Sequence, residues 1–337
     1  MDIQEHILLA EHTTFKIGGP ARFFCRISNE DELVEAVRFA QFKNLPVFIL
    51  GGGSNILISD KGFPGLVIKI EIKGIKEEIR EKREEIRVGA GESWDGFVDW
   101  TVARGYYGLE NLSAIPGTVG AAPVQNIGAY GAEAAQAISS VRALDTEAMK
   151  FVELPKADCR FDYRDSLFKH EKGRYIITRV DFSLSINGKV NIDYKDLQNY
   201  FAMAIDPSLK QVREAVIAVR SHKLPDWKLW GTAGSFFKNP VITADLFKAL
   251  KAKYPDLPGF PEPDGCVKVS LGWILDKVCD VKGLKMGKVG VYEKQALVLV
   301  ALPGASAREV VELSRELMKS VKDKTGLDIE GEVEWVN

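Results

Sequence analysis

The feature that most constrains this 337-residue chain is a stretch from 108 to 133 that is dense in Gly, Ala, Pro and Asn. It shows little hydrophobic periodicity, so it predicts neither a long helix nor a long strand. A segment of this length without regular structure is either a linker or a set of loops wrapped around a ligand. Its low charge argues against a linker. The sequence therefore favours loops that contact a bound molecule.

A second glycine-rich segment, Gly51-Gly52-Gly53-Ser54-Asn55, lies between two predicted strands, 47–50 and 56–58. Glycine lets the backbone approach a ligand closely and adopt positive φ, so that successive N–H groups converge on an anion. The G-x-G-x-x-G spacing and the helix that follows it in dinucleotide-binding folds are both absent. Taken alone, a glycine-rich turn of this kind is more often an ordinary hairpin than a ligand loop.

The densest part of the first stretch runs from Pro116 to Gly131. Small residues repeated this closely allow backbone to press against a flat ring or a diphosphate. Two such loops on separate segments can hold a dinucleotide from both sides. The alternative is a purely structural crossing of Gly and Ala residues.

The remaining periodic segments predict an α+β protein in three parts, with joins near 66 and 220. Ser28 and Asp31 have the spacing of a helix-capping pair, and Ser306 and Glu309 repeat that spacing before the last helix. The charged stretch 68–88 is interpreted as a solvated hairpin or short helix rather than a binding patch. The other predicted elements are a strand at 21–27, helices at 33–40, 93–102, 211–219, 271–278 and 306–321, and strands at 296–302 and 329–335.

The overall charge excludes some partners. Lys and Arg number 45 against 47 Asp and Glu, so no global field attracts nucleic acid or an anionic membrane. No signal peptide and no stretch of about 20 apolar residues is evident. The four cysteines are far apart and the four histidines lack metal-ligand spacing, so we expect reduced thiols, no metal site and a cytoplasmic protein.

Three polar positions stand out as candidates for chemistry. Arg164 follows a short predicted strand, where its fork of donors suits a carboxylate or phosphate, although a surface ion pair is the alternative. Ser235 lies on a tight turn between glycine and aromatic residues, with no histidine nearby in sequence to make it a hydrolase nucleophile. The segment 329–335 alternates acidic and apolar residues and is interpreted as a half-exposed strand.

Taken together, these segments resemble the UDP-N-acetylenolpyruvoylglucosamine reductase family, in order, from about residue 12 to the end. The chain looks like the longer, type I form, because the segment around Tyr194 resembles the one that closes over the substrate in that form. The matching blocks are 12–21 (HTTFKIGGPA), 50–55 (LGGGSN), 108–112 (GLENL), 115–117 (IPG), 125–131 (QNIGAYG), 159–169 (CRFDYRDSLFK), 234–240 (GSFFKNP) and 330–333 (EGEV).

The resemblance implies an FAD-binding fold of the vanillyl-alcohol-oxidase type, made of two subdomains, plus a third α/β domain for the substrate. On this basis we expect the FAD-binding subdomains at 1–66 and 67–220 and the substrate-binding domain at 221–325. Residues 326–337 would form a C-terminal strand that returns to the active site. A monomer is expected.

The resemblance also implies the chemistry: NADPH reduces FAD, which passes hydride to the enol ether of the nucleotide sugar and yields UDP-N-acetylmuramate. Arg164 and Glu332 would stabilise or protonate the enediolate, and Ser235 would give its proton to C2. Flavin contacts are expected from Gly51, Gly53, Ser54, Asn55, Gly117, Gly120, Ile127 and Gly128. Substrate contacts are expected from Tyr194, Lys223, Asn239 and Gln295.

The chain departs from the family pattern at a few positions. Gly331 replaces a proline, Glu334 stands where relatives often have a basic residue, and Ala121-Ala122 replaces hydroxyl side chains. Two other functions remain open. An FAD-linked oxidase of the same superfamily is disfavoured because neither glycine loop carries the His or Cys that attaches flavin in some of those enzymes. A nucleotide-sugar-binding module is disfavoured by the complete set of Arg164, Ser235 and Glu332.

Overall fold

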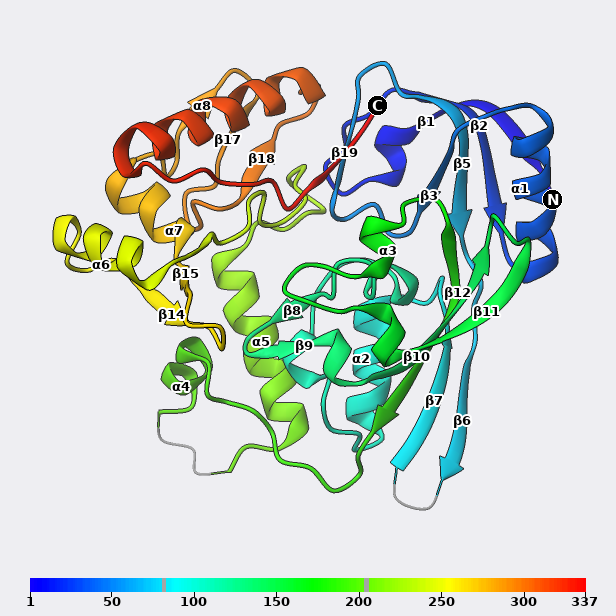
Figure 1. The fold of residues 1–337 in the computed structure, drawn as a ribbon, viewed down its shortest axis with the longest axis horizontal. Helices are drawn as coiled ribbons and strands as arrows, with labels where there is room; N and C mark the ends of the chain where they lie inside the picture. The colour runs from blue at the N-terminus through cyan, green and yellow to red at the C-terminus, as the bar shows by residue number, and fades with distance from the viewer. Residues whose placement is uncertain (81–82, 203–205) are drawn as a thin grey trace. The chain divides into compact units, whose positions relative to one another are not determined.

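The computed structural model describes residues 1–80, 83–202 and 206–337 (Figure 1). The chain forms two compact units, each made of separate stretches of sequence. Unit 1 comprises residues 1–7, 21–53 and 63–221, and unit 2 comprises 8–20, 54–62 and 222–337. Each unit has its own hydrophobic core.

Unit 1 contains a four-stranded sheet covered by one helix. Its order is β1 (Ile3–Leu8), β2 (Pro20–Ile27), β5 (Phe63–Ile70), β3 (Val47–Leu50), and β2, β5 and β3 run parallel. The helix α1 (Glu30–Phe42) buries the predicted apolar face of Leu33, Ala36, Val37 and Ala40. Parallel strands need cover on their faces, which explains why β5 is apolar along most of its length.

The predicted cap of α1 is wrong by one residue. Asn29, rather than Ser28, is the N-cap, and its Oδ1 accepts a hydrogen bond from the Glu32 amide at 2.9 Å. The Glu32 carboxylate reaches back to the Ser28 amide at 2.8 Å. Glu32 is therefore at N3, and its carboxylate binds the residue before the N-cap rather than the N-cap amide of a capping box.

The second sheet of unit 1 is antiparallel and five-stranded, in the order β11-β10-β12-β7-β6. The charged stretch forms β6 and β7, which pair antiparallel, so the predicted hairpin rather than the alternative short helix is present. Glu81 and Lys82 lie outside the described residues. Trp94 and Phe97 of α2 pack against Phe182 of β12, with ring centroids 6.2 and 4.8 Å apart. The bounds are β6 (Ile75–Arg80), β7 (Arg83–Gly89), β10 (Ile138–Asp145), β11 (Lys150–Pro155), β12 (Tyr175–Leu184) and α2 (Trp94–Ala103).

The rest of unit 1 consists of short elements and one long helix. The glycine-rich stretch 108–133 forms only short turns and two-residue strands, as its lack of periodicity predicts. Leu197, Val212, Ala215 and Val216 form a separate small core between α4 and α5. The elements are η2 (Glu110–Leu112), η3 (Val119–Ala121), β8 (Gly128–Ala129), β9 (Ala132–Glu133), η4 (Ala134–Gln136), η5 (Lys156–Cys159), α3 (Leu167–His170), α4 (Lys195–Tyr200) and α5 (Leu209–Lys223).

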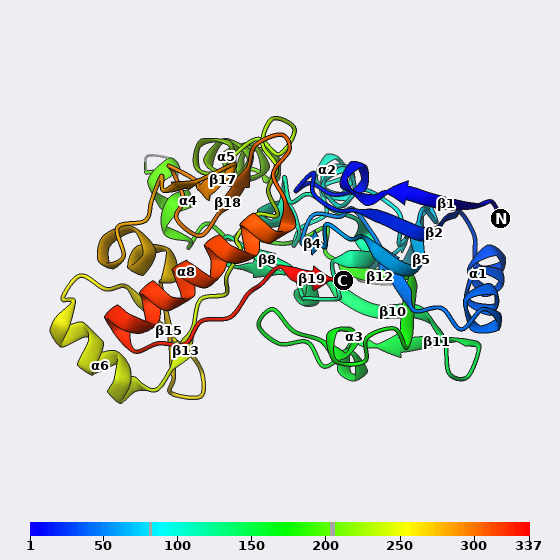
Figure 2. The same ribbon diagram turned by 90° about the horizontal axis from the view of Figure 1, so that it is seen from above.

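Unit 2 is organised around α8 (Ala307–Thr325), which lies along β17 (Val289–Val291) and β18 (Leu299–Ala301) (Figures 1 and 2). Its predicted inward residues Val310, Leu313, Leu317 and Val321 are buried, and the predicted capping box is present. The Asp60 carboxylate also accepts the Ala307 amide at 2.7 Å. The other elements are η1 (Leu9–His12), β4 (Ile56–Ile58), β13 (Val241–Ile242), α6 (Ala244–Lys253), β14 (Gly259–Pro261), β15 (Val267–Val269), α7 (Leu271–Trp273), η6 (Ile274–Val278), β16 (Lys285–Met286) and β19 (Glu334–Val336).

Three predicted elements of unit 2 differ in the structure. The strand expected at 296–302 is only β18, because the Val298 amide donates to the Gln295 carbonyl and closes a turn. The helix expected at 271–278 divides into α7 and the π-helix η6, in which the Cys279 amide donates to the Ile274 carbonyl. The strand expected at 329–335 is β19, which begins at Glu334 and runs parallel to β4.

Candidate functional site

The two glycine-rich loops of unit 1 meet backbone to backbone. A Cβ added to Gly52 would lie 2.6 Å from the Cα of Gly117, and one added to Gly51 would lie 2.8 Å from the Thr118 Oγ1. Gly120 is equally confined, since its Cβ would lie 2.5 Å from that of Ala90. Gly117 has φ of +133°, a conformation that favours glycine. These contacts explain why side chains are excluded at Gly51, Gly52 and Gly120. The backbone of such loops, without side chains in the way, can approach a flat or phosphorylated ligand.

Arg164 belongs to the same region of unit 1. Its Nη2 donates to the Gly128 carbonyl at 2.8 Å, which holds the guanidinium against the second glycine loop. Its own carbonyl accepts from the Lys169 Nζ at 2.8 Å, and its backbone has a positive φ of +54°. A non-glycine residue in this conformation is uncommon and marks a position fixed by its surroundings. A half-buried cation is thereby placed beside Gly128.

Asn126 anchors both the loop and the segment that leads to Arg164. It is 1% exposed. Its Nδ2 donates to the Glu133 carboxylate at 2.8 Å and to the Asp162 carbonyl at 3.1 Å. Its Oδ1 accepts the Ala135 amide at 3.0 Å. Asn126 therefore fixes the glycine loop around Gly128 and the turn before Arg164 through one side chain.

Two aromatic residues and an arginine lie together near the start of α4 in unit 1. The rings of Tyr130 and Tyr194 meet edge to face, with centroids 5.3 Å apart. Burial raises the pKa of the Tyr130 hydroxyl to about 12, an effect that the positive charge of Arg220 partly opposes. Burial also lowers the pKa of Arg220, which hydrogen-bonds to Tyr130. The sequence analysis did not single out Tyr130 or Arg220 as candidate site residues. Arg220 could have been found, because it precedes Lys223 by three positions and therefore lies on the same face of the helix.

Unit 2 brings several predicted residues together through backbone pairing. The Glu332 amide donates to the Phe236 carbonyl at 2.8 Å, and Phe237 pairs with Gly331 in an isolated bridge, so that Ser235 and Glu332 lie on adjacent segments. The Asn55 Nδ2 donates to the Glu332 carbonyl at 3.1 Å. Thus Ser235, Glu332 and Asn55, which are far apart in sequence, belong to one local cluster.

Gln295 and Asn239 border this cluster. Ser235 pairs with Val298, and the Phe236 amide donates to the Leu297 carbonyl at 2.8 Å. The Gln295 Oε1 accepts the Leu297 amide at 3.3 Å, which fixes the turn beside Ser235.

The Asn239 Oδ1 accepts the Leu271 amide at 3.0 Å at the first residue of α7, so this oxygen has a structural role. Lys223 is half-buried at the last residue of α5.

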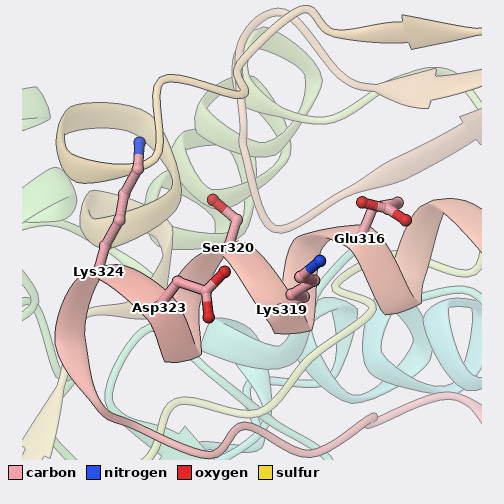
Figure 3. A pocket seen from close by; sticks show the side chains of 5 residues that line it. All are labelled: Glu316, Lys319, Ser320, Asp323 and Lys324. Carbon is pink, nitrogen blue, oxygen red and sulfur yellow. The ribbon is translucent and has the colours of Figure 1, made fainter.

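A separate hollow lies on α8 and does not contain any predicted site residue. Figure 3 shows its five lining side chains, all of which come from this one helix. They carry both signs of charge and a single hydroxyl: Glu316, Lys319, Ser320, Asp323 and Lys324. This mixed surface is typical of a solvated helix face. Among the described residues, no helix is both long enough and apolar enough to cross a membrane.

Comparisons with known proteins identify the family of this chain. The family model "FAD binding domain" matches residues 21–149, and "UDP-N-acetylenolpyruvoylglucosamine reductase, C-terminal domain" matches 225–336. The UDP-N-acetylenolpyruvoylglucosamine reductase of Neisseria gonorrhoeae is 46% identical over 333 residues, covering 97% of this chain and 96% of that protein. The Ralstonia nicotianae enzyme is 43% identical over 337 residues, covering 98% of each chain. The crystal structure of the Thermus caldophilus enzyme covers 100% of both chains with a TM-score of 0.71 and 26% identity.

The FAD-binding domain and the glycine loops of unit 1 define an FAD-dependent oxidoreductase. The expected FAD-binding domain and the further domain of the reductase are confirmed, and the assignment to the vanillyl-alcohol-oxidase type stays a prediction. The chain belongs to the UDP-N-acetylenolpyruvoylglucosamine reductase family.

We expect Gly52→Ala to abolish FAD retention, because its Cβ would come within 2.6 Å of the Gly117 backbone and force the two loops apart. The measurement is the ratio of flavin to protein absorbance after purification, together with the melting temperature. Gly96→Ala is the matched control, since the nearest atom to its Cβ is 3.4 Å away in Ser93. A Gly52→Ala protein that kept a full complement of flavin would contradict the importance of this contact.

Proposed function

We propose that this protein uses NADPH to reduce UDP-N-acetylenolpyruvoylglucosamine to UDP-N-acetylmuramate, a cytoplasmic step of peptidoglycan precursor synthesis, and that it acts as a monomer. The observation that carries the proposal is the hydrogen bond from the Glu332 amide to the Phe236 carbonyl, which joins the segments of two candidate acids, Ser235 and Glu332. The domain limits expected from the sequence, 1–66, 67–220, 221–325 and 326–337, are part of this proposal.

The glycine loops fit FAD because they exclude side chains where they meet. Gly51 and Gly53, with Ser54 and Asn55 after them, would hold the cofactor from one segment. Its other contacts would come from Gly117, Gly120, Ile127 and Gly128. When bound, FAD supplies a hydride carrier between NADPH and the double bond of the enol ether. The chain's own residues then have to bind the sugar nucleotide, stabilise charge and deliver a proton.

Arg164 supplies the positive charge. As hydride adds to the enol ether, negative charge develops on the substrate carboxylate, and a preorganised cation stabilises that charge most where it need not move to do so. The hydrogen bond from Arg164 to the Gly128 carbonyl provides this preorganisation. Glu332 assists by holding or protonating the same carboxylate.

Ser235 supplies the proton for C2. A serine hydroxyl is a weak acid, so it acts in this way only towards a strongly basic carbon centre. The turn that holds Ser235 is fixed on both sides, by its bridge to Val298 and by the backbone contacts of Phe236 and Phe237 with the segment 330–332. The backbone that carries its hydroxyl is therefore held in place for proton transfer.

The remaining residues bind the nucleotide sugar. Lys223 and Arg220 share a face of α5, and two cations at this spacing suit a diphosphate. Tyr194 and Tyr130 present aromatic surface for a ring of the substrate. Asn239 and Gln295 would contact the sugar nucleotide from unit 2.

The test follows flavin absorbance of the purified protein under anaerobic conditions, with NADPH added first and the enolpyruvyl nucleotide sugar second. Bleaching by NADPH followed by recovery with the sugar is the expected result. A protein that stays bleached with the sugar and recovers its colour only in air would instead identify an oxidase. Purified protein without flavin would overturn the proposal.

A further inference from the structure

We infer that Asn111 is a positioning residue that fixes Tyr130 and the Tyr194 segment relative to each other, and through them the affinity for the nucleotide sugar. The inference rests on the proposed function for its kinetic consequence, but its structural part can be measured independently. Asn111 lies in the short turn η2 and is 2% exposed. Its side chain is therefore buried and does not form part of the surface that a ligand would contact. Its action is therefore indirect.

The Asn111 amide joins two separate segments of unit 1. Its Nδ2 donates to the Tyr130 carbonyl at 2.7 Å and to the Asn191 carbonyl at 2.8 Å. Both hydrogens of one NH₂ group are thus shared between the glycine-rich loop and the chain that leads to Tyr194. A side-chain link of this kind sets the distance between the backbone at Tyr130 and the backbone at Asn191.

The chemistry of these two contacts requires an amide. Both partners are carbonyl oxygens, which only accept, so the side chain must offer two donors. The Asn111 Oδ1 is buried and has no hydrogen-bond partner among the described residues. Rotating the amide would place this oxygen against two carbonyls. Asparagine is therefore required here because its NH₂ group supplies both donors. Aspartate has the same shape, but its carboxylate oxygens would be repelled by the two carbonyl oxygens.

The turn that carries Asn111 is itself held firmly. The Gly108 amide donates to the Glu110 carboxylate at 2.7 Å, and the Ser113 hydroxyl donates to the Glu110 carbonyl at 2.6 Å. The Trp94 indole also donates to the Leu112 carbonyl at 2.9 Å. Asn111 thus projects from a fixed support, and the two loops it holds take their position from it.

On the other side, the link passes directly to Tyr194. The Asn191 Oδ1 accepts the Asp193 amide at 3.0 Å, forming a turn one residue before Tyr194, and the Asn191 Nδ2 donates to the Gly131 carbonyl at 3.3 Å. Tyr194 then precedes α4, and its ring meets Tyr130. Losing the Asn111 link leaves the longer Asn191 contact and the ring contact to hold the two tyrosines together.

The test compares Asn111→Asp and the milder Asn111→Ser with the wild-type holoenzyme. Asn111→Asp should raise KM for the enolpyruvyl nucleotide sugar about tenfold or more and leave kcat within about threefold, because binding surface is lost while the acids of unit 2 are untouched. Asn111→Ser, which keeps one donor, should give a smaller increase. FAD content should stay at the wild-type value in both variants.

Hydrogen–deuterium exchange provides the readout that does not depend on activity. Amides of 191–200 should exchange faster in Asn111→Asp than in the wild type, while β10 and β12 remain protected. Thr101→Val is the matched control, because it removes a buried hydrogen bond to Val98 at 2.8 Å in unit 1 and leaves the Asn111 contacts intact.

The outcomes separate the two proposals. Unchanged KM and unchanged exchange at 191–200, in either Asn111 variant that folds, would overturn the inference. If Thr101→Val changed KM and the exchange at 191–200 as much as the Asn111 variants do, the inference would also be overturned, because the effect would then reflect general destabilisation. A wild-type protein that does not turn over the sugar would remove the proposed function, whereas faster exchange at 191–200 in the variants would still establish the positioning role.

Discussion

Replacing Ser235 with alanine is expected to lower turnover of the enolpyruvyl nucleotide sugar by about 10²- to 10⁴-fold, the usual contribution of a positioned proton donor. Reduction of the flavin by NADPH should proceed at the wild-type rate, because that half of the reaction needs no proton from Ser235. Anaerobic stopped-flow absorbance separates the two half-reactions. The variant should bleach normally with NADPH and then recover its colour slowly with the sugar.

Two further variants make this result specific. Ser314→Ala removes a buried hydroxyl of the same unit, one that donates only to the Val311 carbonyl within α8, and should leave turnover unchanged. Ser235→Cys keeps a proton on the side chain and should retain more activity than Ser235→Ala. An unchanged steady-state rate in Ser235→Ala would remove the role given to this serine.

Replacing Arg164 with methionine is expected to lower kcat for the sugar by about 10²- to 10³-fold, the effect typical of losing one preorganised donor to a developing anion. Methionine keeps much of the side-chain length but has no charge and no donor for the Gly128 carbonyl. Arg164→Lys should restore only part of the activity, because an ammonium group cannot reproduce the planar fork.

The control for this experiment is Arg26→Met, which removes an exposed arginine of the same unit that pairs with Glu71. Exposed ion pairs contribute little to the stability of a protein. The Arg26→Met variant should therefore behave as the wild type in both half-reactions. Equal losses in Arg164→Met and Arg26→Met would show that the effect comes from altered net charge rather than from the position of Arg164.

The regular elements of the fold follow from periodicity where one face is buried. The inward stripes of α1 and α8 and the capping box at Ser306 were predictable, because burial and capping act on residues three or four apart. The strand at 296–302 was overestimated, since an apolar run does not reveal the turn closed by Gln295. The π-helix after α7 was likewise hidden, because apolar spacing alone does not distinguish it from an α-helix.

The site was less accessible to reasoning from residues alone. The glycine loops indicated a ligand, and the structure explains them by backbone contact between Gly52 and Gly117. Arg164, Ser235 and Glu332 are single polar residues without a local signature, and only the family resemblance gave them roles. The contacts of Asn111 join segments 19 and 80 residues away, so no sequence window contains both partners.

The parallel pairing of β4 with β19 joins a segment made early in synthesis to the last strand of the chain. Asn55 is joined to Glu332 across 277 residues, and the Ser59 amide donates to the Val336 carbonyl. A ribosome adding about 5–20 residues per second needs on the order of ten seconds to a minute to make that intervening chain. Throughout this interval the nascent polypeptide carries Asn55 and Ser59 without their partners Glu332 and Val336. These contacts therefore form only after translation has passed residue 336.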